Sequence, residues 1–195
     1  MNVLLLSPYP DRILQFLAND DVTVTDKIID ENFLLNIGCE QVISYGYRHK
    51  ITKATIDAVN GMAFNLHTSL LPWNRGADPN FWSWIENSPK GVSIHLISEI
   101  IDRGPILTQR EVGISEHETL SSSYEILQSE IAELFGSFWL SKSRNSTVAT
   151  PQIDGGTYHK SDGIDRFREL LSQGHETRCS EIKRYGQLHG LWVNG

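Results

Sequence analysis

The sequence is poor in cysteine and has no excess of basic residues, and both shortages exclude classes of protein. Its two cysteines, Cys39 and Cys179, lie far apart, so we expect neither a disulfide framework nor a Cys-x-x-Cys metal site. Lysine and arginine number 17 against 24 aspartate and glutamate, which gives a formal net charge of −7. Such a chain offers no broad electrostatic surface to a nucleic-acid backbone, and we expect no nucleic-acid partner.

Long apolar runs are also missing. The run Val3–Leu6 near the amino terminus is too short for a signal peptide or a membrane span, so we expect no membrane partner and a cytoplasmic protein. The sequence contains no His-Glu-x-x-His motif and no Gly-x-Gly-x-x-Gly after its first apolar run. We therefore expect no metal and no nicotinamide cofactor. A homodimer is compatible with these features.

Short apolar runs alternate with amphipathic segments over the first 114 residues. The expected strands are 3–6, 22–25, 41–45, 62–66, 92–97 and 105–114, and the expected helices are 11–17, 52–59 and 77–88. This alternation predicts an α/β fold: a single Rossmann-like domain with a mostly parallel twisted sheet flanked by helices.

The rest of the chain is expected to be helical with a polar connection. Ser115-x-x-Glu118 has the form of a capping box and predicts the start of the longest helix. One apolar stripe follows at helical spacing: Leu120, Tyr124, Leu127, Ile131, Leu134 and Phe138. Residues 162–171 are predicted as one more amphipathic helix. We expect a catalytic domain over 1–145 and a small C-terminal appendage over 146–195.

Two segments carry side chains suited to catalysis. Asn65 and His67 stand two apart at the end of a predicted strand, so both point to the same side. An amide donor and an imidazole at that place could polarise a carbonyl and transfer a proton. Alternatively, Asn65 caps the turn and His67 is an ordinary buried histidine. Asp102, in Asp-Arg-Gly-Pro, is either a third polar group of this site or the residue of a simple Asx turn.

Four motifs together indicate a family. Asn65-x-His67, Ser69-Leu70-Leu71-Pro72, the strand Gly91–His95 and Asp102-Arg103-Gly104-Pro105 occur in this order. In this order and spacing the chain resembles the folate-dependent formyltransferases over about residues 41–114. The resemblance implies a formyltransferase fold and the transfer of a formyl group from 10-formyltetrahydrofolate, a cosubstrate, to a primary amine.

The resemblance also implies roles for single residues. Asn65, His67 and Asp102 would form the catalytic trio. Asn65 and protonated His67 would donate to the developing oxyanion, and Asp102 would hold the charge of the histidine and collect the amine proton. Which of His67 and Asp102 takes the proton first stays open. The implied cofactor-binding residues lie in two loops: Tyr47, Lys50, Ile51, Ile97, Glu99, Ile100, Ile101 and Asp102. For each isoleucine, plain core packing is the alternative.

Features that the chain lacks narrow the choice among acceptor amines. The loop Ser7–Arg12 has no glycine, unlike the phosphate-cradling loop of the glycinamide ribonucleotide branch. The negative charge argues against the initiator-tRNA branch. A nucleotide-linked amino sugar remains, with these candidate substrate-binding residues: Tyr9, Arg12, Trp73, Arg75, Tyr158 and His159. Glycinamide ribonucleotide, a carrier-bound amine, or a non-catalytic folate or nucleotide-sugar binding module are the alternatives.

Overall fold

The computed structural model describes residues 1–141 and 147–193, and its contacts group into two compact units. Unit 1 comprises Met1–His67, Ser93–Thr108 and Ile131–Gln152, and unit 2 comprises Thr68–Val92, Gln109–Glu130 and Ile153–Gly195. The domain boundary expected between residues 145 and 146 stays a prediction, because it falls at residues 142–146, outside the described ones.

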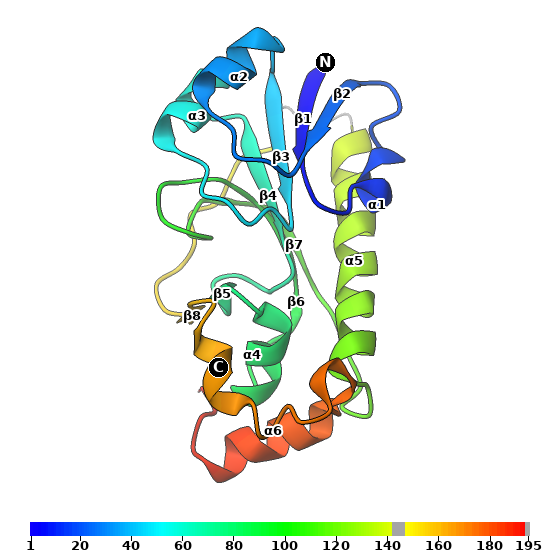
Figure 1. Ribbon diagram of the computed structural model, residues 1–195, viewed down its shortest axis with the longest axis vertical. Coiled ribbons are helices and arrows are strands. Elements are labelled where there is room, and N and C mark those ends of the chain that lie inside the picture. The colour runs from blue at the N-terminus through cyan, green and yellow to red at the C-terminus, as the bar shows by residue number, and fades with distance from the viewer. Residues whose placement is uncertain (142–146, 194–195) are drawn as a thin grey trace. The chain divides into compact units, whose positions relative to one another are not determined.

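A six-stranded sheet in the order β2-β1-β3-β4-β6-β7 forms the framework (Figure 1). Its strands are β1 (Asn2–Leu6), β2 (Asp21–Thr25), β3 (Gln41–Tyr45), β4 (Ala63–His67), β6 (Gly91–Leu96) and β7 (Ile106–Glu111). The pairs β1–β2, β1–β3 and β3–β4 are parallel, and β4 pairs with β6 antiparallel. The expected α/β fold with a mostly parallel sheet is thereby confirmed.

Burial explains the composition of the first strands. Val3–Leu6 of β1, a continuous apolar run, is buried as such runs in a parallel sheet should be, and all five residues of β3 are buried too, including the polar Gln41 and Ser44. Strand β2 lies at the edge and is only partly buried. Its alternating Val22-Thr23-Val24-Thr25 pattern fits that position.

The helices are α1 (Asp11–Leu14), α2 (Glu31–Asn36), α3 (Lys53–Ala58), α4 (Pro79–Ile85), α5 (Leu120–Leu140) and α6 (Cys179–Leu188). In unit 1, α2 and α3 lie on one side of the parallel strands, whereas α1 and the carboxy-terminal part of α5 lie on the other (Figure 1). Phe16, just after α1, contacts Phe135 of α5 edge to face. Helix α2 was not expected from the sequence, although Asp30 caps it by accepting a hydrogen bond from the amide of Phe33 at 2.8 Å.

Two expectations about the carboxy-terminal half are wrong in detail. The longest helix begins at Leu120, not after Ser115, because Thr119 and Ser122 form the reciprocal cap: each side-chain oxygen accepts from the amide of the other residue. Ser115 instead accepts from the amide of His117 in the preceding turn.

The amphipathic helix expected over 162–171 is also wrong. A 3-10 helix, Gly163–Phe167, occupies its first half, a second 3-10 helix, Gly174–Glu176, follows, and the next α-helix is α6. Only Phe167 of the first 3-10 helix is buried. The apolar residues of this segment therefore do not form a continuous buried helical face.

The core of unit 2 is aromatic and packs α4 against α6. Its buried members are Phe81, Trp82, Trp84, Ile85, Leu120, Phe167, Cys179 and Ile182. Gly186 lets the two helices approach closely, since a Cβ at this position would lie 1.8 Å from the carbonyl oxygen of Ile85. A two-stranded parallel pair, β5 (Arg75–Gly76) with β8 (Tyr158–His159), ties residues 158–159 to the same unit.

Among residues 1–141 and 147–193, no helix has the length and apolarity needed to cross a membrane. The same residues contain no group of three or more histidine, cysteine or acidic side chains that could hold a metal ion.

Candidate active site

The two predicted catalytic residues of β4 lie at the end of that strand. The antiparallel register places Asn65 opposite His95 and His67 opposite Ser93. Directly opposite residues share a face of the sheet, so this pairing brings the side chains of Asn65 and His95 together. His67 is 7% exposed and His95 is 1% exposed.

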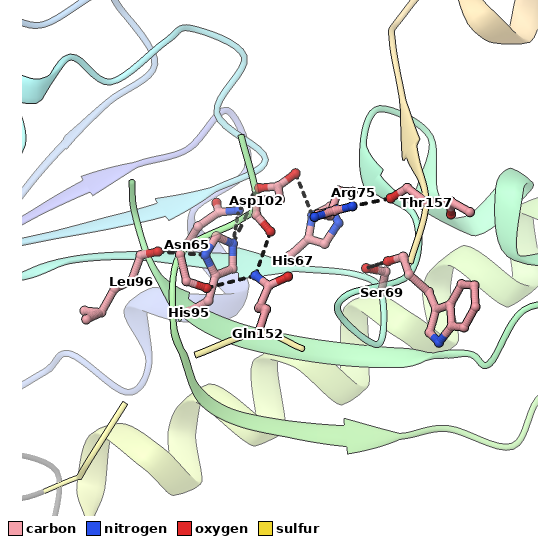
Figure 2. A network of polar contacts seen from close by, with 11 residues as sticks. Asn65, His67, Ser69, Arg75, His95, Leu96, Asp102, Gln152 and Thr157 are labelled. Carbon is pink, nitrogen blue, oxygen red and sulfur yellow. Dashed lines mark hydrogen bonds and ion pairs between the residues drawn. The ribbon is translucent and has the colours of Figure 1, made fainter. Parts of the chain in front are cut away.

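Asn65 contacts two other polar groups of the site, Asp102 and His95 (Figure 2). Its amide nitrogen Nδ2 donates to Oδ1 of Asp102 at 3.0 Å and lies 3.2 Å from Nε2 of His95. A primary amide carries two hydrogens, and both are used here if Nε2 of His95 accepts.

The backbone settles the tautomer of a neutral His95. Its Nδ1 lies 2.8 Å from the carbonyl oxygen of Leu96, which can only accept a hydrogen bond. Nδ1 therefore carries a hydrogen, and Nε2 of the neutral ring presents a lone pair to the amide of Asn65. Asn65 can donate a hydrogen bond to a bound substrate only if its contact with Asp102 or its contact with His95 is broken.

Each of the two carboxylate oxygens of Asp102 faces different neighbouring side chains. Oδ1 faces Asn65 and lies 3.4 Å from Nε2 of His95, and Oδ2 lies 3.6 Å from Nδ1 of His67. The Asp102 side chain is 11% exposed. The carboxylate of Asp102 thus lies beside one ring nitrogen of His67.

The turn that carries Asp102 has an unusual backbone. Asp102 has a φ of 50°, the left-handed region, which aspartate tolerates better than most residues. Gly104 packs against the end of β6, where a Cβ would lie 1.7 Å from the carbonyl oxygen of Leu96. The glycine is therefore required for this close approach, and it holds the Asp102 turn against β6.

The expected trio of Asn65, His67 and Asp102 is thus brought together in unit 1. The cluster combines an amide, an imidazole and a carboxylate within hydrogen-bonding or ion-pairing distance. An imidazole beside a carboxylate can donate a proton to, or accept one from, a reacting group.

The expected cofactor-binding residues divide into two groups. Ile51 is buried in the core of unit 1, and Tyr47 and Ile97 are partly buried against the same core, so the two isoleucines agree with their alternative interpretation. Apart from Asp102, the others are exposed: Lys50, Glu99, Ile100 and Ile101. A cavity of about 300 Å³ lies at the carboxyl ends of β1, β2 and β3. Its lining residues are Pro8, Asp26, Gly46, Tyr47, Arg48 and His49.

Tyr47 is fixed within this cavity wall. Its hydroxyl donates to the carbonyl oxygen of Lys27 at 2.8 Å, and its ring meets that of His49 edge to face. Partial burial raises the pKa of the Tyr47 phenol, so the hydroxyl stays protonated at neutral pH.

Of the expected substrate-binding residues, Tyr9 and Arg12 belong to unit 1. The ring of Tyr9 packs edge to face on Tyr45 at 5.1 Å and covers Gly46, where a Cβ would lie 1.9 Å from the tyrosine oxygen. Tyr9 is 39% exposed and Arg12 is half-buried.

Trp73, Arg75, Tyr158 and His159 belong to unit 2. Arg75 donates to the carbonyl oxygens of Thr157 at 3.3 Å and Gly155 at 3.2 Å, and so it holds the segment before β8 (Figure 2 shows the Thr157 bond). Trp73 is half-buried, and Tyr158 is 46% exposed.

His159 points into the interior of unit 2. Its ring stacks on Trp82 at 3.7 Å, and its Nε2 lies 3.0 Å from Oε1 of the buried Glu86, too obliquely for a hydrogen bond. The structure thus gives this ring a packing role, beside the substrate contact that the sequence suggested.

Two residues of the site escaped the sequence analysis. His95 was noted only as part of the strand Gly91–His95, although its place in that motif was a usable signal. Gln152 donates to the carbonyl oxygens of both Asp102 and Gly104 at 2.8 Å (Figure 2). Nothing in its sequence context marks it, since it lies 50 residues from Asp102.

Several known proteins are similar to this chain. The dTDP-4-amino-4,6-dideoxyglucose formyltransferase of Mycobacterium bovis is 32% identical over 130 residues, which cover 66% of this chain and 54% of that protein. The methionyl-tRNA formyltransferase of Thermodesulfovibrio yellowstonii is 34% identical over 113 residues, 54% of this chain and 37% of that one. The chain thus matches about half the length, or less, of these curated relatives.

One solved structure matches over its whole length. The formyltransferase PseJ from Anoxybacillus kamchatkensis, in complex with UDP-4,6-dideoxy-4-formamido-L-AltNAc and tetrahydrofolate, is 37% identical. The match has a TM-score of 0.88 and covers 96% of this chain and 100% of that chain.

A family model described as formyl transferase matches residues 23–135, which include the trio Asn65, His67 and Asp102. More than half of the chain is covered by that model, and the fold is that of PseJ. The chain belongs to the formyl transferase family.

Proposed function

We propose that this protein transfers a formyl group from 10-formyltetrahydrofolate to the primary amine of a nucleotide-linked amino sugar. The observation that carries the proposal is the cluster of Asn65, His67 and Asp102 at the end of β4, in a fold that matches PseJ over its full length. The M. bovis relative is named for a dTDP-linked amino sugar, and PseJ is in complex with a UDP-linked formamido sugar, which supports this choice of acceptor.

The residues of unit 1 fit a folate. The cavity of about 300 Å³ beside Tyr47 is of the size that cofactor sites have, and it lies at the carboxyl ends of parallel strands. Ile100 and Ile101, 68% and 52% exposed, add apolar surface on the loop before Asp102. We assign Tyr47, Lys50, Glu99 and these two isoleucines to the folate side. The folate supplies an activated formyl carbon when it is bound.

His67 and Asp102 handle charge and protons in the proposed reaction. Attack by a neutral amine makes the formyl oxygen negative and leaves an extra proton on the nitrogen. A cationic His67 stabilises the oxygen, and Asp102, 3.6 Å from its Nδ1, holds that cation in place. The carboxylate of Asp102 is the base to which the amine proton is delivered, directly or through a water molecule. When the tetrahedral intermediate collapses, the bond between the formyl carbon and N10 of the folate breaks, and N10 of the departing tetrahydrofolate takes up a proton.

Asn65 is proposed as the second donor to the oxyanion. Its Nδ2 hydrogens lie toward Asp102 and His95 in the structure, so binding exchanges one of these contacts for the substrate oxygen. The contact with neutral His95, at 3.2 Å, is the longer of the two and the easier to give up.

The nucleotide is proposed to act as a handle for the acceptor. The residues assigned to it are Tyr9, Arg12, Trp73, Arg75, Tyr158 and His159. Binding energy from a remote group can be used to position the amine, so its removal lowers turnover as well as affinity.

We also propose a cytoplasmic location and a homodimer. Both cysteines are free thiols, which suits a reducing compartment. Fractionation of the native host and sedimentation of the purified chain test the two statements.

The experiment offers amines to the purified protein with 10-formyltetrahydrofolate and follows the release of tetrahydrofolate. A UDP- or dTDP-linked amino sugar should be formylated faster than the same sugar without its nucleotide. Faster formylation of glycinamide ribonucleotide or methionyl-tRNA than of every sugar nucleotide would reject the acceptor class. Binding of folate without turnover of any amine would favour a non-catalytic binding module.

A further inference from the structure

The turn that carries Asp102 is held from two sides. On one side the end of β6 supports it: the carbonyl oxygen of Pro105 accepts from the amide of Leu96 at 2.9 Å. On the other side the side chain of Gln152 crosses the turn and donates to the carbonyl oxygens of Asp102 and Gly104, both at 2.8 Å. One amide nitrogen therefore fixes two peptide groups of a three-residue segment.

Gln152 reaches the turn because its own segment is tied to the sheet. Thr150 forms an isolated antiparallel bridge with Ile106, with two backbone hydrogen bonds of 2.8 Å. Ile106 is the first residue of β7, two residues after Gly104. The bridge thus places residue 152 beside the turn, although 50 positions separate it from Asp102.

The orientation of the amide follows from its partners. The two carbonyl oxygens can only accept, so the nitrogen of Gln152 must face them. Its oxygen Oε1 is buried and has no hydrogen-bond partner among the residues that the structure describes. A buried acceptor without a hydrogen bond is unfavourable. The orientation of the Gln152 amide is therefore explained by the two hydrogen bonds that its nitrogen donates.

We infer that Gln152 is a positioning residue of the proposed active site, which holds the left-handed backbone at Asp102 so that its carboxylate faces Asn65 and His67. The inference rests on the proposed function for its catalytic consequence. Asp102 adopts a φ of 50°, a conformation that persists only where surrounding contacts impose it. A small displacement of a catalytic group is enough to slow a reaction by about 100-fold.

The test compares three variants of the full chain. Gln152→Ala removes both hydrogen bonds, and Gln152→Glu keeps the size but places an acceptor against two acceptors. Gln109→Ala is the matched control, because Gln109 also donates to a backbone carbonyl, that of Leu71 at 3.3 Å, and both residues belong to unit 2, which does not contain the trio. Circular dichroism and thermal unfolding verify that each variant is folded.

Three readouts separate positioning from general stability. In Q152A, kcat should fall at least ~10-fold with KM for the folate within about twofold of wild type, since only the alignment of Asp102 changes. The kcat of Q152E, divided by the kcat of wild type at the same pH, should rise as the pH falls toward 5. The reason is that a protonated carboxyl at position 152 can donate a hydrogen bond to one of the two carbonyl oxygens. The NMR signals of the Asn65 side-chain amide should move in Q152A as they do in Asp102→Asn, and stay in place in Q109A.

Different results would overturn the role of Gln152 and the proposed function. A wild-type protein that formylates no amine would overturn the function, and the Asn65 signals would still decide the role of Gln152. Signals that do not move in a folded Q152A, or a kcat within twofold of an active wild type, would overturn the inference alone. If Q152A does not fold, the same criteria apply to Q152E.

Discussion

The side-chain amide of Asn65 lies 3.0 Å from Oδ1 of Asp102, across 37 positions of sequence. One residue comes from the end of a strand and the other from a turn with a left-handed backbone. Their contact puts the carboxylate between an amide donor on one oxygen and the imidazole of His67 on the other. This division of the two carboxylate oxygens is the basis of the first prediction.

Replacing Asp102 by Asn, or His67 by Asn, should lower kcat at least ~100-fold, the scale of a lost acid–base or oxyanion partner. Each change is close in volume, so the variants should fold. The measurement is tetrahydrofolate release at saturating substrates. Asp57→Asn is the matched control, since Asp57 is an exposed carboxylate on α3 that pairs with Lys53. Wild-type turnover in either trio variant would refute the assignment.

Lys90 should make the stability of the protein depend on pH above neutrality. Burial lowers its pKa to about 8 from the usual 10.5, while its Nζ donates to the carbonyl oxygens of Ser83 and Ser88 and lies 4.0 Å over the Trp84 ring. Between pH 8 and 10.5 the unfolded chain binds more protons at this residue, so unfolding becomes harder as the pH rises.

The effect is measured as a difference between two proteins. The free energy of unfolding of wild type minus that of Lys90→Met should rise by at most about 3 kcal/mol from pH 7.5 to 10.5, since each pKa unit is worth about 1.4 kcal/mol. Urea unfolding at several pH values gives both curves. Parallel curves would show that the ammonium group is not desolvated as its surroundings suggest.

The two thiols should differ in their reactivity. Burial raises the pKa of Cys179 to about 11, and its side chain is fully buried against Ser123. Cys39 also has a raised pKa but is partly exposed. Iodoacetamide at pH 8 should therefore modify Cys39 first, with both reacting in urea. Mass spectrometry of the native protein gives the order, and early labelling of Cys179 would contradict its burial.

His159 should stabilise unit 2 through Glu86. The carboxylate of Glu86 also accepts hydrogen bonds from Thr157 at 3.0 Å and Asn74 at 3.2 Å, and it is 8% exposed. His159→Ala removes the ring stacked on Trp82 and should cost roughly 2 to 4 kcal/mol of unfolding free energy.

A double-mutant cycle with Glu86→Gln separates the two contributions. A coupling energy of about 0.5 to 3 kcal/mol is expected if the imidazole and the carboxylate interact. Additive effects would assign the whole loss to the stacking on Trp82.

The fold could be predicted because its strands are short apolar runs between turn residues. Val3–Leu6 and Gln41–Tyr45 are buried on both faces, and such runs leave a clear signal. The helix α2 was missed because its six residues, Glu31–Asn36, bury only Leu34 and so lack a repeating apolar face.

The site was predicted in part for a similar reason. Asn65 and His67 share a strand, and their common face follows from the pleat alone. The roles of His95 and Gln152 depend on contacts made across 30 and 50 residues, which no local pattern encodes. Outside the site, the buried Glu86 of unit 2 was also missed, because a single acidic residue at the end of a helix is ordinary on a surface and becomes informative only when it is buried.

The pairing of β4 with β6 has a consequence for misfolding. Asn65 faces His95 only in the observed register, because a slip by one residue moves every side chain of β6 to the other face of the sheet. Ile94 or Leu96 would then stand beside Asn65, and the imidazole would be lost from the cluster. A slipped molecule would keep its strand content and a native-like far-ultraviolet spectrum. Preparations of equal purity and helicity could therefore differ in the fraction of molecules able to turn over.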